Sequence, residues 1–339
     1  MSFNPNLTTR ALDACVVMTD LEPDDILALY LLREQLAAFG SRLLVIVGES
    51  SASKVELATV ILRLLGLEAA MVLQGEVSDK EYPSTMYGAF GVSSEYKPRF
   101  RESIMTKVDA FLVAVAAPLF IIMKPPHELW VIKSEYLARA TVVMYGGFNF
   151  RALSREELGT LTYMFNTLFF ESIVYESFHA TGAANALTHA NTSLFKYMHE
   201  QANSSPFWRG LRSAVDAWNG SIIADCLETV SRLSREMIVD FKAGDWAKLH
   251  SKKRRIEDRN WKVVASIVDA DGQQMVFADC AMASVLSSTD AVPGVRGHLA
   301  FSGDGYTIAE ADADGRVFFV KGMDFATALA RMTAQAKAT

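Results

Sequence analysis

The sequence contains little cysteine and no excess of basic residues. Its three cysteines, Cys15, Cys226 and Cys280, show no paired spacing, which argues against a disulfide framework or a zinc ribbon and fits a reducing compartment. The net charge is −6, from 33 basic and 39 acidic residues, and this balance argues against nucleic acid as the main partner.

Long hydrophobic runs are also missing. The longest one, residues 110–123, is too short to span a bilayer and is interrupted by Pro118. The polar N-terminus, residues 1–10, lacks the apolar core of a signal peptide. We therefore expect a cytoplasmic protein that does not enter a membrane.

Hydrophobic residues make up 50% of the 339, enough for one large α/β domain or two small ones. Apolar runs at 14–20, 42–48 and 69–73 predict strands, and the segments between them, 24–36 and 51–65, predict helices. This alternation predicts a right-handed, doubly wound, mainly parallel sheet that is flanked by helices.

The remaining elements follow from the same patterns. No linker composition separates any part of the chain, so we expect a single domain over 1–339. The patterns predict helices at 102–116, 154–169, 188–261, from Asp279 and from Asp324, strands at 129–132, 141–145, 173–178 and 275–277, and a small C-terminal hairpin around 312–315.

An acidic cluster follows the first predicted strand. Asp20, Glu22, Asp24 and Asp25 fall within six positions, and Pro23 stands where a helix can begin. Ligands of open α/β sheets bind at the carboxyl ends of the strands, where this cluster lies. Carboxylates that crowd together repel one another unless a cation or proton lies between them, and oxygen ligands suit Ca²⁺ or Mg²⁺. The alternative is a helix N-terminus with acidic capping residues.

Two segments resemble motifs of the inosine-uridine preferring nucleoside hydrolase superfamily. Residues 18–25, Met-Thr-Asp-Leu-Glu-Pro-Asp-Asp, resemble its N-terminal Asp-Thr-Asp-Pro-Gly-x-Asp-Asp loop, with Met18 in place of the first Asp. Residues 277–283, Phe-Ala-Asp-Cys-Ala-Met-Ala, are similar to the segment that carries its C-terminal metal ligand. Asp279 occupies the ligand position, and Ala278 stands where the family often has a His.

Two further segments resemble ribose-binding parts of that superfamily less specifically. Residues 47–54 are similar to its Val-Gly-Asn-x-x-x-x-Lys motif, with Glu49 in place of the Asn. Glu49 follows a predicted strand, so it should face the same crevice as Asp20, although a loop carboxylate in solvent is an alternative. Residues 142–147 resemble a Val-Met-Gly-Gly strand end, and Asn149 stands as the remnant of a ribose-binding Glu-Phe-Asn. A turn residue is the alternative for Asn149.

Two single positions complete the resemblance. Residues 87–91, Tyr-Gly-Ala-Phe-Gly, look like the family's His-Gly-x-x-Gly loop, with Tyr87 in place of the His. The strand predicted to end at Ile132 takes the place of the strand whose end supplies a backbone carbonyl to the metal.

The resemblance implies a nucleoside hydrolase-like α/β domain that binds Ca²⁺ deep at the edge of the sheet. Asp20, Asp25, Asp279 and the carbonyl of Ile132 would hold the ion, and Asp20 would accept a proton from a metal-bound water that attacks the anomeric carbon. The substrate-binding residues would be Asp24, Glu49, Tyr87 and Asn149. The implied reaction is hydrolysis of the N-glycosidic bond of a ribonucleoside, or of a related modified nucleoside, by a homodimer or homotetramer.

Two other classes of function remain open at the level of sequence. The substitutions at Met18, Glu49, Tyr87 and Ala278 fit a catalytically inactive relative that binds a ligand or serves as a structural subunit. A metal-dependent hydrolase of phosphate esters would use the same acidic cluster. It has less support because neither a Lys/Arg set nor a Gly-rich phosphate loop flanks the carboxylates.

Overall fold

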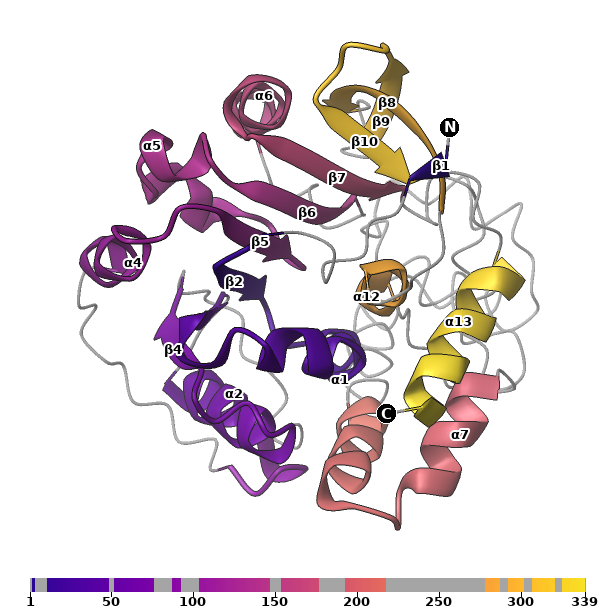
Figure 1. Ribbon diagram of the computed structural model, residues 1–339. Helices are drawn as coiled ribbons and strands as arrows, with labels where there is room; N and C mark the ends of the chain where they lie inside the picture. The colour runs from indigo at the N-terminus through magenta and orange to yellow at the C-terminus, as the bar shows by residue number, and fades with distance from the viewer. Residues whose placement is uncertain are drawn as a thin grey trace, which may run out of the picture.

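A mostly parallel sheet with helices on both faces forms the protein (Figure 1). The computed structural model describes residues 2–3, 11–48, 52–75, 87–92, 104–146, 154–176, 193–217, 278–286, 292–301, 307–320 and 325–338. The prediction of an α/β fold with a mainly parallel sheet is confirmed for these residues. The predicted strand at 275–277 and most of the predicted helical segment at 188–261 lie outside them.

The sheet has ten strands within the described part of the chain. Their order is β1-β8-β10-β7-β6-β5-β2-β3-β4, with β9 paired to β8. Neighbours from β4 to β10 run parallel, whereas β8 is antiparallel to β1, β9 and β10. The strands are β1 Ser2–Phe3, β2 Ala14–Thr19, β3 Leu43–Val47, β4 Met71–Gln74, β5 Pro118–Ile122, β6 Thr141–Gly146, β7 Glu171–Glu176, β8 Val292–Phe301, β9 Thr307–Ala311 and β10 Val317–Val320.

The helices connect the strands and cover the sheet. None of those described is long and apolar enough to cross a bilayer. They are α1 Pro23–Ala37, α2 Ala52–Leu64, α4 Ile104–Leu112, α5 Ser134–Leu137, α6 Arg155–Tyr163, α7 Ser193–Gln201, α12 Ala278–Leu286 and α13 Phe325–Ala338. Residues 206–217 form a further helix, and short helical turns lie at η2 Gly40–Arg42, η3 His127–Val131 and η5 Met164–Leu168.

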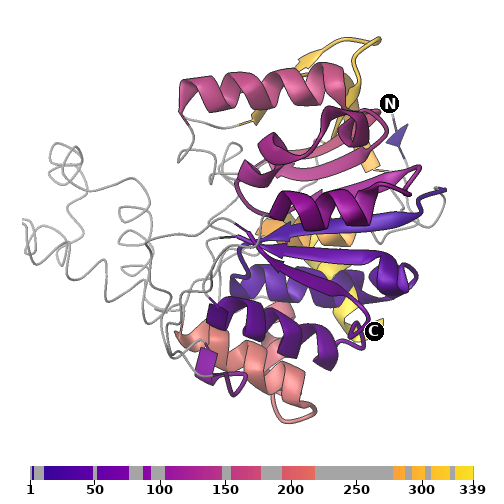
Figure 2. The same cartoon turned by 90° about the vertical axis from the view of Figure 1, so that its left-hand side faces the viewer.

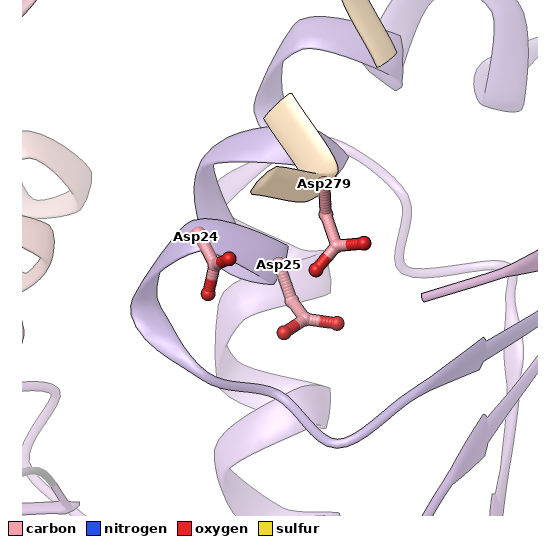
Figure 3. Close-up of side chains that lie close together, drawn as sticks. All are labelled: Asp24, Asp25 and Asp279. Atoms are coloured by element: carbon pink, nitrogen blue, oxygen red, sulfur yellow. The ribbon is translucent and has the colours of Figure 1, made fainter. Parts of the chain in front are cut away.

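Two hydrophobic layers hold the helices against the sheet. Figure 2 shows helices on both sides of the strands. Alternate residues of β2 feed both layers: Val17 packs with α1, α2 and α12, and Val16 packs with α4, α5 and α6. Strands that are buried on both faces read as continuous apolar runs, which is why the sequence predicts them well. The first turns of α1 and α12 lie side by side in the first layer (Figure 3).

The prediction of a strand at 129–132 is wrong. Leu129 belongs to the 3₁₀ turn His127–Val131, and the strand of this region is β5, Pro118–Ile122. The pattern misled because the apolar run at 110–123 contains the end of α4, a turn and β5, and it does not show where the helix ends and the strand begins. Pro118 opens β5, at the first position of a strand, where its missing N–H is tolerated.

The predicted C-terminal hairpin is also wrong in its pairing. Two strands do flank residues 312–315, but β9 and β10 each pair with β8, and Gly297 of β8 is opposite both Ala311 and Val317. The connection therefore crosses β8 at Gly297. An added Cβ at Gly297 would lie 2.0 Å from the carbonyl oxygen of Glu310, so the crossing requires glycine there.

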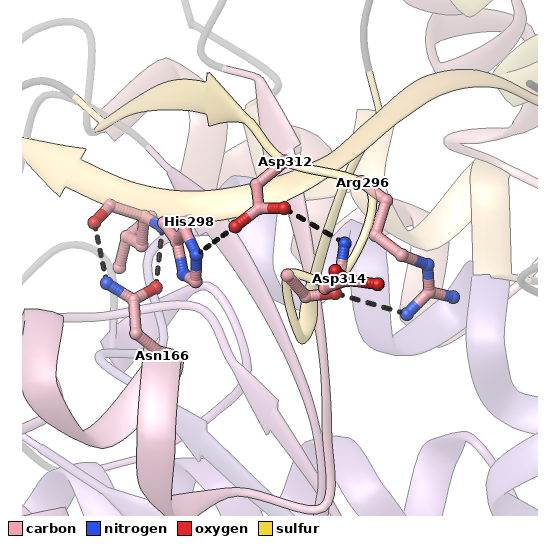
Figure 4. Close-up of polar contacts among 7 residues, drawn as sticks. Asn166, Arg296, His298, Asp312 and Asp314 are labelled. Carbon is pink, nitrogen blue, oxygen red and sulfur yellow. Dashed lines mark hydrogen bonds and ion pairs between the residues drawn. The ribbon is translucent and has the colours of Figure 1, made fainter.

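Asn166, in the π-helical turn η5, is hydrogen-bonded to this antiparallel part of the sheet (Figure 4). Its amide nitrogen donates to the carbonyl oxygen of Leu299 at 2.9 Å, and its amide oxygen accepts from the Leu299 N–H at 2.6 Å. The side chain thus imitates the backbone of a neighbouring strand. Beside it, His298 Nε2 lies 2.7 Å from Asp312 Oδ2 across the strand pair.

We expect Asn166→Ala to lower the free energy of unfolding by about 1–3 kcal/mol, because both backbone groups of Leu299 lose their partner. Urea unfolding followed by circular dichroism measures this change. Thr160→Ala, on the exposed side of α6, is the matched control and should change the unfolding free energy little. Equal effects of the two substitutions would contradict the assignment.

Candidate metal centre

The acidic loop joins β2, in the middle of the sheet, to the first turn of α1. β2 ends at Thr19 and α1 begins at Pro23, so only residues 20–22 lie between them. Leu21, which is fully buried, has φ +60°, a left-handed conformation that costs a non-glycine residue about 1–2 kcal/mol. Strain of this kind persists only where the surrounding structure enforces it, and it is common at functional sites.

Hydrogen bonds from the loop hold the carboxylate of Asp25. Thr19 Oγ1 donates to Asp25 Oδ1 at 2.6 Å and accepts from the N–H of Leu21 at 2.9 Å. The N–H of Glu22 donates to Asp25 Oδ2 at 3.1 Å. Each oxygen of Asp25 therefore already has a donor, which orients the side chain before any ligand binds.

Helix α12 brings Asp279 to this loop from the far end of the chain. It packs against α1, and the thiol of Cys280 donates to the carbonyl oxygen of Asp24 at 3.1 Å. Asp24, Asp25 and Asp279 each offer a carboxylate oxygen, and these oxygens lie within 4.8 Å of one another (Figure 3). The side chains come from the first turns of two helices, where the helix dipoles favour negative charge.

Burial makes this group of carboxylates costly to ionise without a cation. Burial raises the pKa of Asp25 well above its usual value, and the neighbouring charges of Asp20, Asp279 and Asp24 add to the effect. The pKa of Asp279 is raised in the same way by burial and then by Asp24 and Asp20. Asp20 itself is only 4% exposed, so all four carboxylates are largely buried from solvent.

The donor set indicates which ions fit. Asp24, Asp25 and Asp279 offer only carboxylate oxygens, which are the preferred ligands of hard divalent cations. Ca²⁺ and Mg²⁺ both satisfy this chemistry. The residues present therefore fit a divalent cation. Asp25 and Asp279 lie together as predicted, but the third carboxylate of this group is Asp24, which was expected to bind substrate, in place of the expected ligand Asp20.

The other predicted site residues are Glu49, Asn149, Tyr87 and Ile132. Glu49 and Asn149 lie outside the described residues. Tyr87 is buried, 5% exposed, in the hydrophobic layer that contains α1 and α2. Ile132 follows a 3₁₀ turn and not a strand, so the structural reason for choosing its carbonyl as a ligand is lost and its role stays a prediction.

Sequence reasoning missed a second group of buried charges at the same edge of the sheet. Lys124, two residues after β5, lies 2.7 Å from Glu128 in an ion pair whose side chains are 2% and 4% exposed. The ammonium of Lys54 is also buried and donates to the carbonyl oxygen of Gly48 at 3.3 Å. The available signal was Lys124 itself, a charged residue between an apolar run and two prolines.

No family model matches the chain, and no curated protein is significantly similar to it. The resemblance to nucleoside hydrolases therefore stays a prediction.

The raised pKa values make stability depend on pH when no metal is present. Asp25 and Asp279 bind protons more tightly in the folded protein than in the unfolded chain. Stability without metal should therefore fall as the pH rises above about 4, the pKa of an unfolded Asp, and through the raised pKa values of the folded state. Thermal unfolding in EDTA between pH 5 and pH 8 measures this, and a saturating divalent cation should reduce the dependence.

We expect Asp279→Asn to raise the melting temperature in EDTA at pH 8, because it removes one of the buried repelling charges. The same substitution should weaken stabilisation by divalent cations. Asp312→Asn is the control of opposite sign. The pKa of Asp312 is lowered by the Asp314 N–H and by His298, so its charge favours the folded state above the unfolded pKa. A lower melting temperature for Asp279→Asn in EDTA would show that the carboxylates do not repel in the folded protein.

Proposed function

We propose that the protein is a divalent cation-dependent hydrolase whose centre is formed by Asp20, Asp24, Asp25 and Asp279. The observation that supports this most directly is the meeting of Asp24, Asp25 and Asp279 oxygens within 4.8 Å in a buried place. A purely structural role would hold several buried like charges close together, at a cost that packing alone does not explain.

The chemistry assigned to each residue follows from its place. Asp24, Asp25 and Asp279 would hold the cation, which, when bound, lowers the pKa of a coordinated water. Asp20, at the end of β2, accepts the proton of the attacking water. Asp24, the most exposed of the four at 7%, accepts hydrogen bonds from a diol of the substrate. The remaining negative charge favours a substrate that becomes positive as its bond breaks.

An N-glycosidic bond meets that last condition, since its cleavage proceeds through a cationic sugar. Together with the resemblance of residues 18–25 and 277–283, this supports hydrolysis of a ribonucleoside or a related nucleoside, with Ca²⁺ as the cation. Homo-oligomerisation rests on the resemblance alone. A cytoplasmic location is supported by Cys15 and Cys280, which are both buried and not in disulfides.

Hydrolysis of phosphate esters is the second candidate, and one observation favours it. Lys54 and Lys124 lie at the same edge of the sheet as the carboxylates, so cations do flank the centre. Glu128 balances the charge of Lys124, however, and both ammonium groups are buried. The glycosidase therefore has the stronger support.

A panel of purine, pyrimidine and modified ribonucleosides, assayed for free reducing sugar with Ca²⁺ present, tests the proposal. We expect hydrolysis that EDTA abolishes and Ca²⁺ restores. Asp20→Asn should lower the rate at least about 10²-fold, the usual contribution of a general base. The control is Asp216→Asn, an exposed carboxylate paired with Arg212, which should keep the wild-type rate.

Each other outcome selects a different conclusion. An unchanged rate of Asp20→Asn would exclude this residue as the base. Phosphate release from nucleotides without release of the base would favour the phosphate esterase. Nucleoside binding with retained cation but no turnover would favour a catalytically inactive relative.

A further inference from the structure

A lysine side chain crosses the carboxyl end of the central strand β2. Lys124 follows β5, Gly48 follows β3, and β2 lies between these two strands in the sheet. A Cβ added to Gly48 would lie 2.0 Å from Lys124 Cε and 2.6 Å from its Nζ, so the lysine lies directly against that glycine. The side chain of Lys124 therefore crosses the end of β2, after which Asp20 begins the acidic loop.

Glu128 pairs with Lys124 and lies at the end of the next strand in the sheet, β4. Its Oε2 lies 2.7 Å from Lys124 Nζ, and its Oε1 would be 2.3 Å from a Cβ added at Gly75, just after β4. Lys124 Nζ also donates to the carbonyl oxygen of Pro125 at 2.6 Å. Glycine at both strand ends thus leaves the room that the ion pair fills.

Hydrogen bonds connect this group to the acidic centre. Lys54 Nζ donates to the carbonyl oxygen of Gly48, and the N–H of Gly48 donates to the carbonyl oxygen of Thr19 at 2.8 Å. Thr19 in turn donates through its hydroxyl to Asp25. Both ammonium groups therefore lie near Gly48, which is hydrogen-bonded to Thr19. Thr19 is the last residue of β2 and precedes Asp20.

Burying such charges is costly. Each buried ion loses several kcal/mol of hydration, and an apolar pair of the same volume often stabilises a protein as well or better. The Lys124–Glu128 pair and Lys54 are therefore not explained by the stability of the fold alone. The group of four buried carboxylates, Asp20, Asp24, Asp25 and Asp279, lies at the same edge of the sheet.

We propose that Lys54 and Lys124 are built-in counter-charges that keep the acidic loop formed in the absence of a divalent cation, and that Glu128 limits the effect of Lys124. This proposal rests on the cation site proposed above. All three act through the field at the carboxylates and are positioning residues. An ammonium that attracts the carboxylates also repels an incoming cation, so these lysines should weaken cation affinity.

If the lysines are counter-charges, Lys124→Met and Glu128→Gln should change Ca²⁺ affinity in opposite directions, which simple packing does not predict. Lys124→Met removes a repelling charge and should tighten Ca²⁺ binding about tenfold, as expected for a unit charge acting at short range through a partly polar medium. Glu128→Gln leaves Lys124 unbalanced and should weaken Ca²⁺ binding severalfold. Both substitutions disturb a buried pair, so both should lower stability.

Calorimetric titration with Ca²⁺, together with thermal unfolding in EDTA and in saturating Ca²⁺, provides the measurement. Lys133→Met is the matched control: Lys133 pairs with Asp109 at 2.7 Å but is 52% exposed, and its loss should leave Ca²⁺ affinity unchanged. Lys54→Met is the second variant and should tighten binding in the same direction as Lys124→Met. It decides the question if Lys124→Met does not fold.

The outcomes separate the two proposals. If the wild type binds no Ca²⁺ or Mg²⁺ and neither ion stabilises it, the cation site itself is wrong. If the wild type binds but the Lys54 and Lys124 variants bind equally or more weakly, the cation site stands and the counter-charge role is wrong. An equal loss of stability with and without Ca²⁺ would likewise reduce the lysines to packing residues.

Discussion

Repulsion among buried carboxylates is the constraint on which the centre of this protein depends. Asp20, Asp24, Asp25 and Asp279 are each at most 7% exposed, and burial and mutual repulsion raise the pKa of Asp25 and Asp279. Such a group stays in place only if protons, a metal ion or neighbouring cations balance it. The structure offers helix N-termini and the Thr19 hydroxyl toward that balance, and the proposed counter-charges Lys54 and Lys124 would add to it.

The rest of the fold positions these charges. β2 is central in the sheet, and α1, which follows it after three residues, is buried along most of its length. α12 packs on α1 and thereby fixes Asp279 beside Asp25. Leu21, in the short loop between this strand and this helix, has a left-handed conformation. A cation placed here would bind to ligands that are already oriented, which reduces the entropy lost on binding.

Many elements were predictable because their signal is local. Buried parallel strands such as β2, β3 and β6 are continuous apolar runs, and α1 begins at a proline after acidic residues. Where two elements share one apolar run, as α4 and β5 do, the pattern does not show the boundary, and the sequence predicts a strand at 129–132 instead. The pairing of β9 and β10 failed for another reason: a turn signal at 312–315 reports a reversal of the chain but not the strand that lies between its arms.

The sequence alone determined the α/β class and the acidic loop, because hydrophobic periodicity and the grouping of carboxylates are written in neighbouring residues. It also singled out Asp279 as a partner of that loop, through a resemblance and not through a physical rule. Only the tertiary structure decided that Asp279 meets Asp24 and Asp25, that β8 separates β9 from β10, and that Lys124 and Glu128 are buried across the strand ends. These facts depend on strand order and on contacts between residues far apart in the chain, and no local pattern encodes them.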